Sequence, residues 1–127
     1  MSLDITPAVP AGRQTIQRYG AGKFVVAGIE HRGPVLVFAE ATVSWNVSDF
    51  AGVSAESLAP LLERAADTDI VLFGCGPSLM PVPLDIRDRF KAAGVAVEPM
   101  DTGAACRTFN VLLGEDRRVA AALIPVD

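Results

Sequence analysis

Two short segments of this chain carry residue types that could bind a ligand. The first runs from Gly74 to Ser78, reads Gly-Cys-Gly-Pro-Ser and follows a continuous apolar stretch. Glycines allow a tight turn, and successive N–H groups in such a turn can bind an anion. Three prolines between positions 77 and 83 remove three of those donors, and neither the phosphate-loop nor the dinucleotide-binding motif is present. The segment therefore either binds a ligand, through Gly74, Cys75, Gly76 and Ser78, or only connects a strand tightly to a helix.

The second segment, from Asp101 to Asn110, is typical of the start of a helix and is rich in small residues. Free N–H groups and the helix dipole at such a terminus can hold an anion. If Asp101 is the N-cap, however, its carboxylate already accepts from those donors. The candidate binding residues are Thr102, Arg107 and Asn110, of which the last two lie on roughly one helix face. The alternative is that Arg107 is a solvated or structurally paired side chain.

Residues for other kinds of chemistry do not gather in the sequence. Cys75 and Cys106 could approach each other at one end of a sheet, but there is no Cys-x-x-Cys motif, and a free cysteine is usually a small buried apolar residue. The single histidine, His31, falls in a polar turn, whereas a metal site needs three or four ligands. We therefore expect no metal, no cofactor and no catalytic residue. This favours a non-catalytic chain over an enzyme without deciding between them.

Composition limits the class of protein. The chain has 127 residues, 50% of them hydrophobic, and a formal net charge of −4. Its basic residues form no stripe, so we expect no nucleic-acid partner. Its apolar runs are far shorter than the ~20 residues of a membrane helix, so we expect no membrane span. The first residues lack the pattern of an export signal, and two cysteines suit a reducing compartment. We therefore expect the protein in the cytoplasm.

The elements that position the two segments follow from the hydrophobic pattern. Residues 1–13 carry prolines and no periodic pattern, so we expect a flexible tail there and a single domain over residues 14–127. In the first half, strands are expected over 16–19, 24–29, 35–38 and 41–47, with turns at 21–22 and 30–34. Neighbouring strands in this half are expected to pair as an antiparallel hairpin.

The second half of the chain alternates between strands and helices. Helices are expected after a cap at Ser57, over 86–93, and from a cap at Asp101 or Thr102 through about residue 113. Strands are expected over 70–73, 95–97 and 119–124. This order implies an α/β fold in which a right-handed crossover joins two parallel strands. The predicted fold has a mixed, largely parallel central sheet with helices on its faces and an N-terminal antiparallel β-hairpin.

The C-terminal block is distinctive: residues 101–113 read DTGAACRTFNVLL, and residues 115–125 read EDRRVAAALIP. Further features at matching places are Tyr19, Gly22-Lys23-Phe24, Val35 to Phe38, Trp45 and Gly74 to Pro77. Over roughly residues 16–125 the chain resembles the Mth938-domain family of uncharacterised small proteins. That family includes the mitochondrial NADH dehydrogenase (complex I) assembly factor three and the adipogenesis-associated Mth938-domain protein.

The resemblance implies a three-layer α/β domain with a mixed sheet of about five strands, which agrees with the residue patterns. It also implies a non-catalytic binding or assembly-factor-like domain with a protein partner, linked by family to respiratory complex I. The residues leave an alternative open: a small-molecule binder or minor enzyme that takes an anion or nucleotide-like ligand with the 74–80 and 101–107 loops. A homo-oligomer is open as well. A mitochondrial location does not transfer, because we see no presequence.

Overall fold

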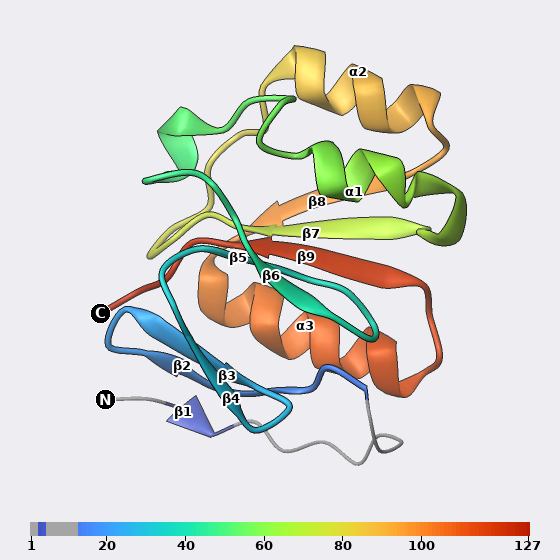
Figure 1. Ribbon diagram of the computed structural model, residues 1–127. Helices are drawn as coiled ribbons and strands as arrows, with labels where there is room; N and C mark the ends of the chain where they lie inside the picture. The colour runs from blue at the N-terminus through green and yellow to red at the C-terminus, as the bar shows by residue number, and fades with distance from the viewer. Residues whose placement is uncertain (1–2, 5–12) are drawn as a thin grey trace.

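The computed structural model describes residues 3–4 and 13–127, which form two sheets with helices packed against them (Figure 1). The smaller sheet is antiparallel and contains, in this order, β1 (Leu3–Asp4), β2 (Ile16–Gly20), β3 (Lys23–Val26) and β4 (Ile29–Arg32). The larger sheet has the order β6 (Thr42–Ser44), β5 (Val35–Val37), β9 (Val119–Leu123), β7 (Ile70–Gly74) and β8 (Ala96–Met100). The helices of the described residues are α1 (Ala59–Glu63), α2 (Leu84–Ala92) and α3 (Thr102–Gly114), with short 3-10 turns η1 (Phe50–Gly52) and η2 (Ala65–Asp67).

The larger sheet is mixed, as predicted. Strand β7 runs parallel to both β8 and β9, whereas β5 runs antiparallel to β9 and to β6. Every residue of β9 is buried, because this strand of small and apolar residues is covered on both faces. Helices α1 and α2 lie on one face of the sheet, and α3 lies on the other (Figure 1). The prediction of a layered α/β domain with a five-stranded mixed sheet is confirmed.

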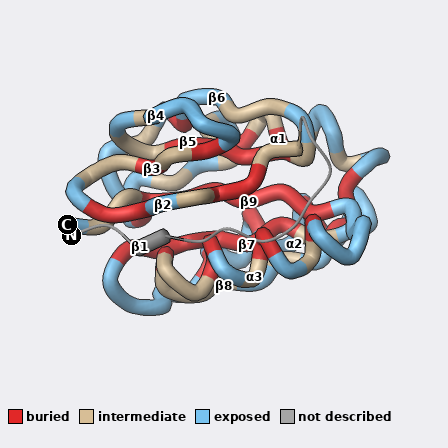
Figure 2. Tube along the Cα trace, turned by 90° about the horizontal axis from the view of Figure 1, so that it is seen from below, coloured by how far each residue is buried: buried red, intermediate tan, exposed pale blue. Residues whose placement is uncertain are grey.

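Two hydrophobic cores hold these layers together. On the side of α1 and α2, the ring of Phe73 meets the rings of Phe50 and Phe90 edge to face, with centroid distances of 5.9 and 6.3 Å. On the other side, Phe109 of α3 and Phe24 of β3 are fully buried between the two sheets. Buried segments accordingly run along β7, β9 and β2 in Figure 2. The smaller sheet therefore completes the second core rather than standing apart from the domain.

The N-terminal hairpin is larger than predicted, and the polar turn expected over 30–34 is wrong in its first three residues. These residues belong to β4, which pairs with β3. The turn between the two strands is Ala27-Gly28, with φ of 48° and 82°, and it matches the Ala21-Gly22 turn before β3, with φ of 54° and 75°. Both are two-residue turns with positive φ, the kind that joins antiparallel strands. No side chain of β4 is buried, so the strand lacks the alternating apolar pattern that would have predicted it.

Two helix starts show how local hydrogen bonds set the boundaries. The predicted cap at Ser57 is wrong: its hydroxyl donates to the Ser54 carbonyl oxygen at 2.8 Å and stabilises the turn before α1. Pro60 lies in the first turn of α1, as expected from its missing N–H group. For α3 the cap is Asp101, whose Oδ1 accepts from the Ala104 N–H at 2.9 Å. The helix that opens the second candidate segment therefore begins where the sequence places it.

The tail predicted over residues 1–13 falls mostly outside the described residues. In its described part, Leu3–Asp4 pairs with β2 as strand β1. Arg13 Nη1 bonds to Asp116 Oδ1 at 3.0 Å, which attaches the start of the domain to the turn before β9. Within the ranges 3–4 and 13–127, no helix is long and apolar enough to cross a membrane.

Candidate functional site

The connections that follow β7 and β8 diverge to opposite faces of the larger sheet. From β7 the chain continues into α2, and from β8 it continues into α3 (Figure 1). In open α/β sheets, such divergence at the carboxyl ends of neighbouring strands opens a crevice in which ligands bind. A cavity of about 450 Å³ lies at this end of the sheet. The candidate site therefore occupies the place that the sheet topology favours.

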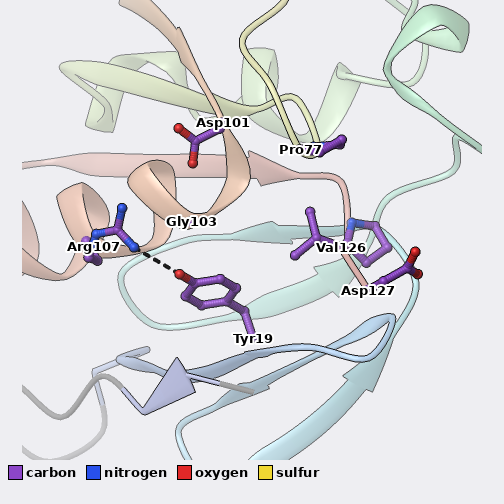
Figure 3. A pocket seen from close by; sticks show the side chains of 9 residues that line it. Tyr19, Pro77, Asp101, Gly103, Arg107, Val126 and Asp127 are labelled. Carbon is purple, nitrogen blue, oxygen red and sulfur yellow. Dashed lines mark hydrogen bonds between the residues drawn. The ribbon is translucent and has the colours of Figure 1, made fainter. Parts of the chain in front are cut away.

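Four segments of the chain line this cavity. They are Tyr19 of β2, Gly76 and Pro77 after β7, the start of α3 with Asp101, Gly103 and Arg107, and residues 125–127 after β9 (Figure 3). Of the residues predicted from the sequence, Gly76 and Arg107 line the cavity. The charged side chains on its wall are one guanidinium, from Arg107, and two carboxylates, from Asp101 and Asp127. The cavity thus combines both signs of charge with apolar proline and valine surface.

Arg107 of α3 is held in place by Tyr19 from the smaller sheet. Its Nη1 donates to the Tyr19 hydroxyl oxygen at 2.9 Å, and the dashed line in Figure 3 marks this bond. Tyr19 is buried, whereas Arg107 is exposed. A guanidinium has five N–H donors, so a single bond to a hydroxyl leaves most of them available. The pair therefore presents a positioned but open cation at the wall of the cavity.

Gly103 makes the close approach of Tyr19 to α3 feasible. A Cβ atom at position 103 would lie 2.7 Å from the Tyr19 hydroxyl oxygen and 3.2 Å from its Cζ atom. Both atoms belong to a rigid ring system, so the ring would have to move as a whole. A glycine in the first turn of a helix costs about 1 kcal/mol relative to alanine. That cost is offset here by a contact that no larger residue permits.

Thr102 ties together the three loops at this end of the sheet. Its Oγ1 accepts from the Gly76 N–H at 2.9 Å and donates to the Ile124 carbonyl oxygen at 2.6 Å. Its own N–H donates to the Gly76 carbonyl oxygen at 2.9 Å. The side chain is fully buried. Thr102, a predicted binding residue, is therefore engaged in joining the loops after β7 and β9 to α3.

The hydrogen bonds at the start of α3 reduce its capacity to bind an anion. The Thr102 N–H reaches Gly76, the Ala104 N–H reaches the Asp101 carboxylate and the Ala105 N–H reaches the Asp101 carbonyl oxygen. The Gly76 N–H, which could bind an anion in a glycine-rich loop, already donates to Thr102 Oγ1. The donors that make helix termini and glycine turns attractive to anions are thus mostly bonded within the protein.

The remaining residues of the 74–78 segment are placed differently from one another. Gly74 ends β7, where a Cβ atom would lie 2.8 Å from Leu123 Cδ2, so this glycine permits close packing. Gly76 adopts a φ of 107°, which only glycine accommodates readily. Cys75 is buried, and Ser78 is exposed outside the cavity lining. The segment therefore acts mainly as a tight connection, and Gly76 is its part that faces the cavity.

Asn110 lies away from the cavity and against β2. Its Oδ1 accepts from the Ile16 N–H at 2.9 Å, and its Nδ2 donates to the Ile16 carbonyl oxygen at 2.8 Å. The side chain is buried and matches one peptide unit of the strand with both bonds. The sequence places Arg107 and Asn110 on one helix face, but the structure does not give them a shared exposed patch.

The two thiols are buried and protonated. Desolvation raises the pKa of Cys106 to about 12 and also raises the pKa of Cys75, whose Sγ lies 3.7 Å from the Phe73 carbonyl oxygen. Both cysteines are free. A thiol is nucleophilic as the thiolate, so neither side chain is activated at neutral pH. Within the described ranges, His, Cys, Asp and Glu side chains form no group of three or more that could hold a metal ion.

The family of the chain follows from comparison with known proteins. The model of a family described as "Protein of unknown function (DUF498/DUF598)" matches residues 16–124. The chain belongs to this family. The match covers β2 to β9, and it includes the cavity-lining residues from Tyr19 to Arg107 but not residues 125–127.

Relatives in the DUF498/DUF598 family include proteins with and without an assigned role. The chain is 41% identical over 116 residues to an uncharacterized protein of Rhodobacter capsulatus, covering 91% of this chain and 88% of that protein. It is 36% identical over 110 residues to the protein of Xenopus tropicalis named NADH dehydrogenase [ubiquinone] 1 alpha subcomplex assembly factor 3. This match covers 87% of this chain and 60% of the assembly factor, so the chain spans about three fifths of that relative's length.

Solved structures share the fold of this member of the family. A crystal structure from Bartonella henselae, described as an outer membrane protein, is 34% identical with a TM-score of 0.86, covering 92% of this chain and 98% of that one. A solution structure from Bordetella pertussis, described as an Mth938-like domain, is 26% identical with a TM-score of 0.82, covering 97% and 92%. The resemblance to Mth938-domain proteins that the C-terminal block suggests is confirmed.

The binding residues predicted from the sequence omit seven of the nine residues that line the cavity, namely Tyr19, Pro77, Asp101, Gly103 and residues 125–127. A weak signal existed for Gly103, because a glycine in the first turn of a helix lowers helix stability and implies a close neighbour. The pairing of Tyr19 with Arg107 spans 88 positions and gives no local pattern. Only the packing of the smaller sheet on α3 brings these residues together.

Proposed function

We propose that this chain is a non-catalytic, assembly-factor-like binding domain that acts on respiratory NADH dehydrogenase, complex I, through a protein partner. The observation that carries the proposal is the 36% identity over 110 residues to a protein named as an assembly factor of that enzyme. That identity covers 87% of this chain. Because the chain matches only 60% of the relative, the role of the remaining part of that protein is not carried over.

The arrangement of polar groups supports a binding role over a chemical one. Both thiols are kept protonated by burial. Thr102 and Asn110, the buried polar side chains of the candidate set, have their hydrogen bonds within the protein. Arg107 and Tyr19 remain as positioned groups at an open surface, and these two residue types contribute strongly to protein interfaces. A recognition surface suits this set better than an acid–base or nucleophilic mechanism.

The proposal is tested by removing the protein from the organism that encodes it. We expect membranes of the deletion strain to lose assembled NADH dehydrogenase on native gels and to lose NADH:quinone activity, while succinate oxidation is unchanged. Expression of the wild-type chain should restore both. Affinity purification of the tagged chain should recover subunits of the enzyme. Unchanged NADH dehydrogenase in the deletion strain, with no subunit recovered, contradicts the proposal.

We also propose that the protein works in the cytoplasm. Two free, buried thiols suit a reducing compartment. Cell fractionation with antibodies against the native chain tests this location. Recovery of the chain in the periplasmic or outer-membrane fraction, the latter being the description of the Bartonella henselae structure, contradicts it.

The second candidate function is small-molecule binding, and the volume of the cavity favours it. Small-ligand pockets usually enclose about 300–1,000 Å³, and this cavity of about 450 Å³ lies within that range. The bonded N–H groups around it weigh against a simple anion. Thermal shift against a panel of nucleotides, phosphates and carboxylates separates the two functions. A ligand at 100 times its dissociation constant stabilises by about 2.7 kcal/mol, so the absence of any shift removes this candidate.

A further inference from the structure

The loop between β7 and α2 exposes an unusual amount of apolar side chain. The described residues include six large hydrophobic side chains that are exposed. Leu79 at 61% and Met80 at 37% belong to this loop, and Leu84 at 72% is the first residue of α2. No charged residue occurs from Ile70 to Leu84. Single exposed apolar residues are ordinary, but Leu79 and Met80 are adjacent in a loop whose Pro77 lines a cavity, and such a grouping is typical of an interaction site.

The loop is held in shape rather than free to fold over its own apolar residues. Val82 is buried in the core on the side of α1 and α2 and anchors the middle of the loop. The Cys75 thiol lies 3.6 Å from the Met80 carbonyl oxygen, to which it donates. Prolines at positions 77, 81 and 83 restrict φ along the same stretch. Leu79 and Met80 are therefore kept exposed, and binding through them would cost little ordering entropy.

The exposed loop is continuous with the cavity at the end of the sheet through Pro77, which lines it. We call the surface formed by Pro77, Leu79, Met80, Asp101 and Asp127 the loop–cavity surface. Its two carboxylates lie on opposite sides of the cavity, and Arg107 on the lining is bonded to Tyr19 at one edge (Figure 3). The charged side chains of the lining have a net charge of −1. The whole chain is also negative, with a formal net charge of −4.

We propose that the loop–cavity surface binds a basic, apolar segment of a protein partner. Leu79 and Met80 cover large apolar side chains of that segment, and a lysine or arginine next to them enters the cavity toward Asp101 and Asp127. An acidic segment or a nucleic acid would meet two carboxylates and one cation, Arg107, so the net charge of the lining opposes its binding. Beyond Leu84 the surface is mixed in charge, with Arg87, Asp88 and Lys91 close by, so the proposed contact ends before α2.

This inference rests on the proposed function only in taking the occupant to be a protein. Unassembled subunits expose apolar surface that assembly later buries, which is the kind of surface an apolar loop can cover. The loop–cavity surface names where such a segment binds and what residue types it contains. It also separates the binding residues from Thr102 and Asn110, which hold the domain together.

Site-specific photocrosslinking in the full chain tests the surface. A photoreactive benzoylphenylalanine replaces Leu79 in one strain and Ile29 in a second strain. Ile29, at the start of β4, is a matched control because it is 62% exposed, as Leu79 is at 61%, and lies on the other sheet. We expect position 79 to crosslink a partner segment with large apolar residues and a nearby lysine or arginine. Its yield should exceed that of position 29 by about tenfold, the effect of one central interface residue.

Removal of one charge provides the second measurement. Asp101→Asn removes the negative charge but keeps an effective helix cap, since asparagine caps as well as aspartate. In the strain with the crosslinker at position 79, this change should lower the yield by about threefold or more, with the urea unfolding midpoint unchanged. A yield that does not respond to Asp101→Asn, in a chain with unchanged stability, overturns the charge part of the proposal and with it the basic segment.

Other crosslinking results distinguish an error in the loop–cavity surface from an error in the proposed function. Equal yields at positions 79 and 29 overturn the surface, as does crosslinking of position 79 to a second copy of the chain, to lipid or to an acidic segment. If the tagged chain recovers NADH dehydrogenase subunits while position 79 gives no crosslink, the surface is wrong and the proposed function stands. If position 79 crosslinks a basic, apolar segment of an unrelated protein, the surface stands and the proposed function fails.

Discussion

Arg107 and Asn110 lie one turn apart on α3, and both bond to β2, yet their surroundings differ completely. Asn110 is buried and bonds to both backbone groups of Ile16. Arg107 is exposed and bonds to the hydroxyl at the end of the Tyr19 side chain. One residue bonds to the backbone of a strand, and the other presents a charge to an open cavity. Two polar residues on one helix can thus serve stability and recognition separately.

The difference depends on where β2 departs from regular pairing. The register of β2 with β3 shifts between Ile16 and Arg18, and the Ile16 backbone groups turn toward α3, where Asn110 meets them. Buried backbone groups without a partner are costly, so this position needs a side chain with both a donor and an acceptor. Three positions nearer the start of the helix, the tyrosine side chain spans the gap to α3, and the helix residue stays accessible.

Phe109, which lies between the two polar residues, should show the largest effect. Its ring is fully buried between α3 and both sheets. Phe109→Ala should lower the free energy of unfolding by about 3–5 kcal/mol because it removes the ring and leaves a cavity. Urea unfolding measures this change, and Val111→Ala on the exposed face of the same helix is the control, expected to change it by less than about 0.5 kcal/mol. Equal effects would contradict the position of α3 between the sheets.

Asn110→Ala should follow, at about 2–4 kcal/mol of lost stability, because it leaves the buried Ile16 N–H and carbonyl groups without partners. Asn110→Asp is the sharper variant: it keeps the acceptor for the Ile16 N–H but has no donor for the carbonyl oxygen. Both variants should be destabilised in urea unfolding. If Asn110→Ala unfolds at the wild-type midpoint, the assignment of Asn110 to stability is wrong and its place in a binding site is open again.

Much of the fold is predictable because its central strands are buried on both faces. The unbroken apolar runs at 70–73 and 119–124 predict β7 and β9 closely. Strand β8 is longer than the predicted strand over 95–97. Its end is hard to predict because a proline such as Pro99 is unusual inside a strand. The Ala96 N–H and the Met100 carbonyl oxygen bond toward β7, so Pro99 points its missing donor to the free edge. Strand β4 is missed for the related reason that an exposed edge strand lacks a buried face.

The sequence predicts where the candidate site lies but not which residues form it. Loops at the carboxyl ends of parallel strands meet at one edge, which is why Gly76 and Arg107 line one cavity. Thr102 and Asn110 look like binding residues in the sequence because polar types at a helix start suit ligands. Their burial, and the hydrogen bonds that it requires, depend on contacts across 22 and 94 positions. Nothing in the local sequence specifies those partners.

Gly103→Ala should have an intermediate effect that tests the approach of Tyr19 to α3. Alanine favours the helix by about 1 kcal/mol, but its Cβ would lie 2.7 Å from the Tyr19 hydroxyl oxygen. We expect a net loss of about 1–2 kcal/mol as the ring is displaced. Combining it with Tyr19→Phe, which removes the nearest atom, should cost less than the sum of the two single changes. Additive effects would show that the ring and the glycine are not in contact in solution.

Arg107→Ala should have the smallest effect on stability, below about 0.5 kcal/mol, because an exposed side chain with one neutral hydrogen bond contributes little to folding. The same change should weaken recovery of the partner in affinity purification, since it removes the guanidinium N–H donors that carbonyl oxygens of the partner can accept. Tyr19→Phe removes the hydroxyl that holds Arg107, so it should weaken recovery less than Arg107→Ala does. Urea unfolding and partner recovery are therefore measured on the same variants. If Arg107→Ala destabilises the protein as much as Phe109→Ala, the arginine is structural, and the contrast between Arg107 and Asn110 disappears.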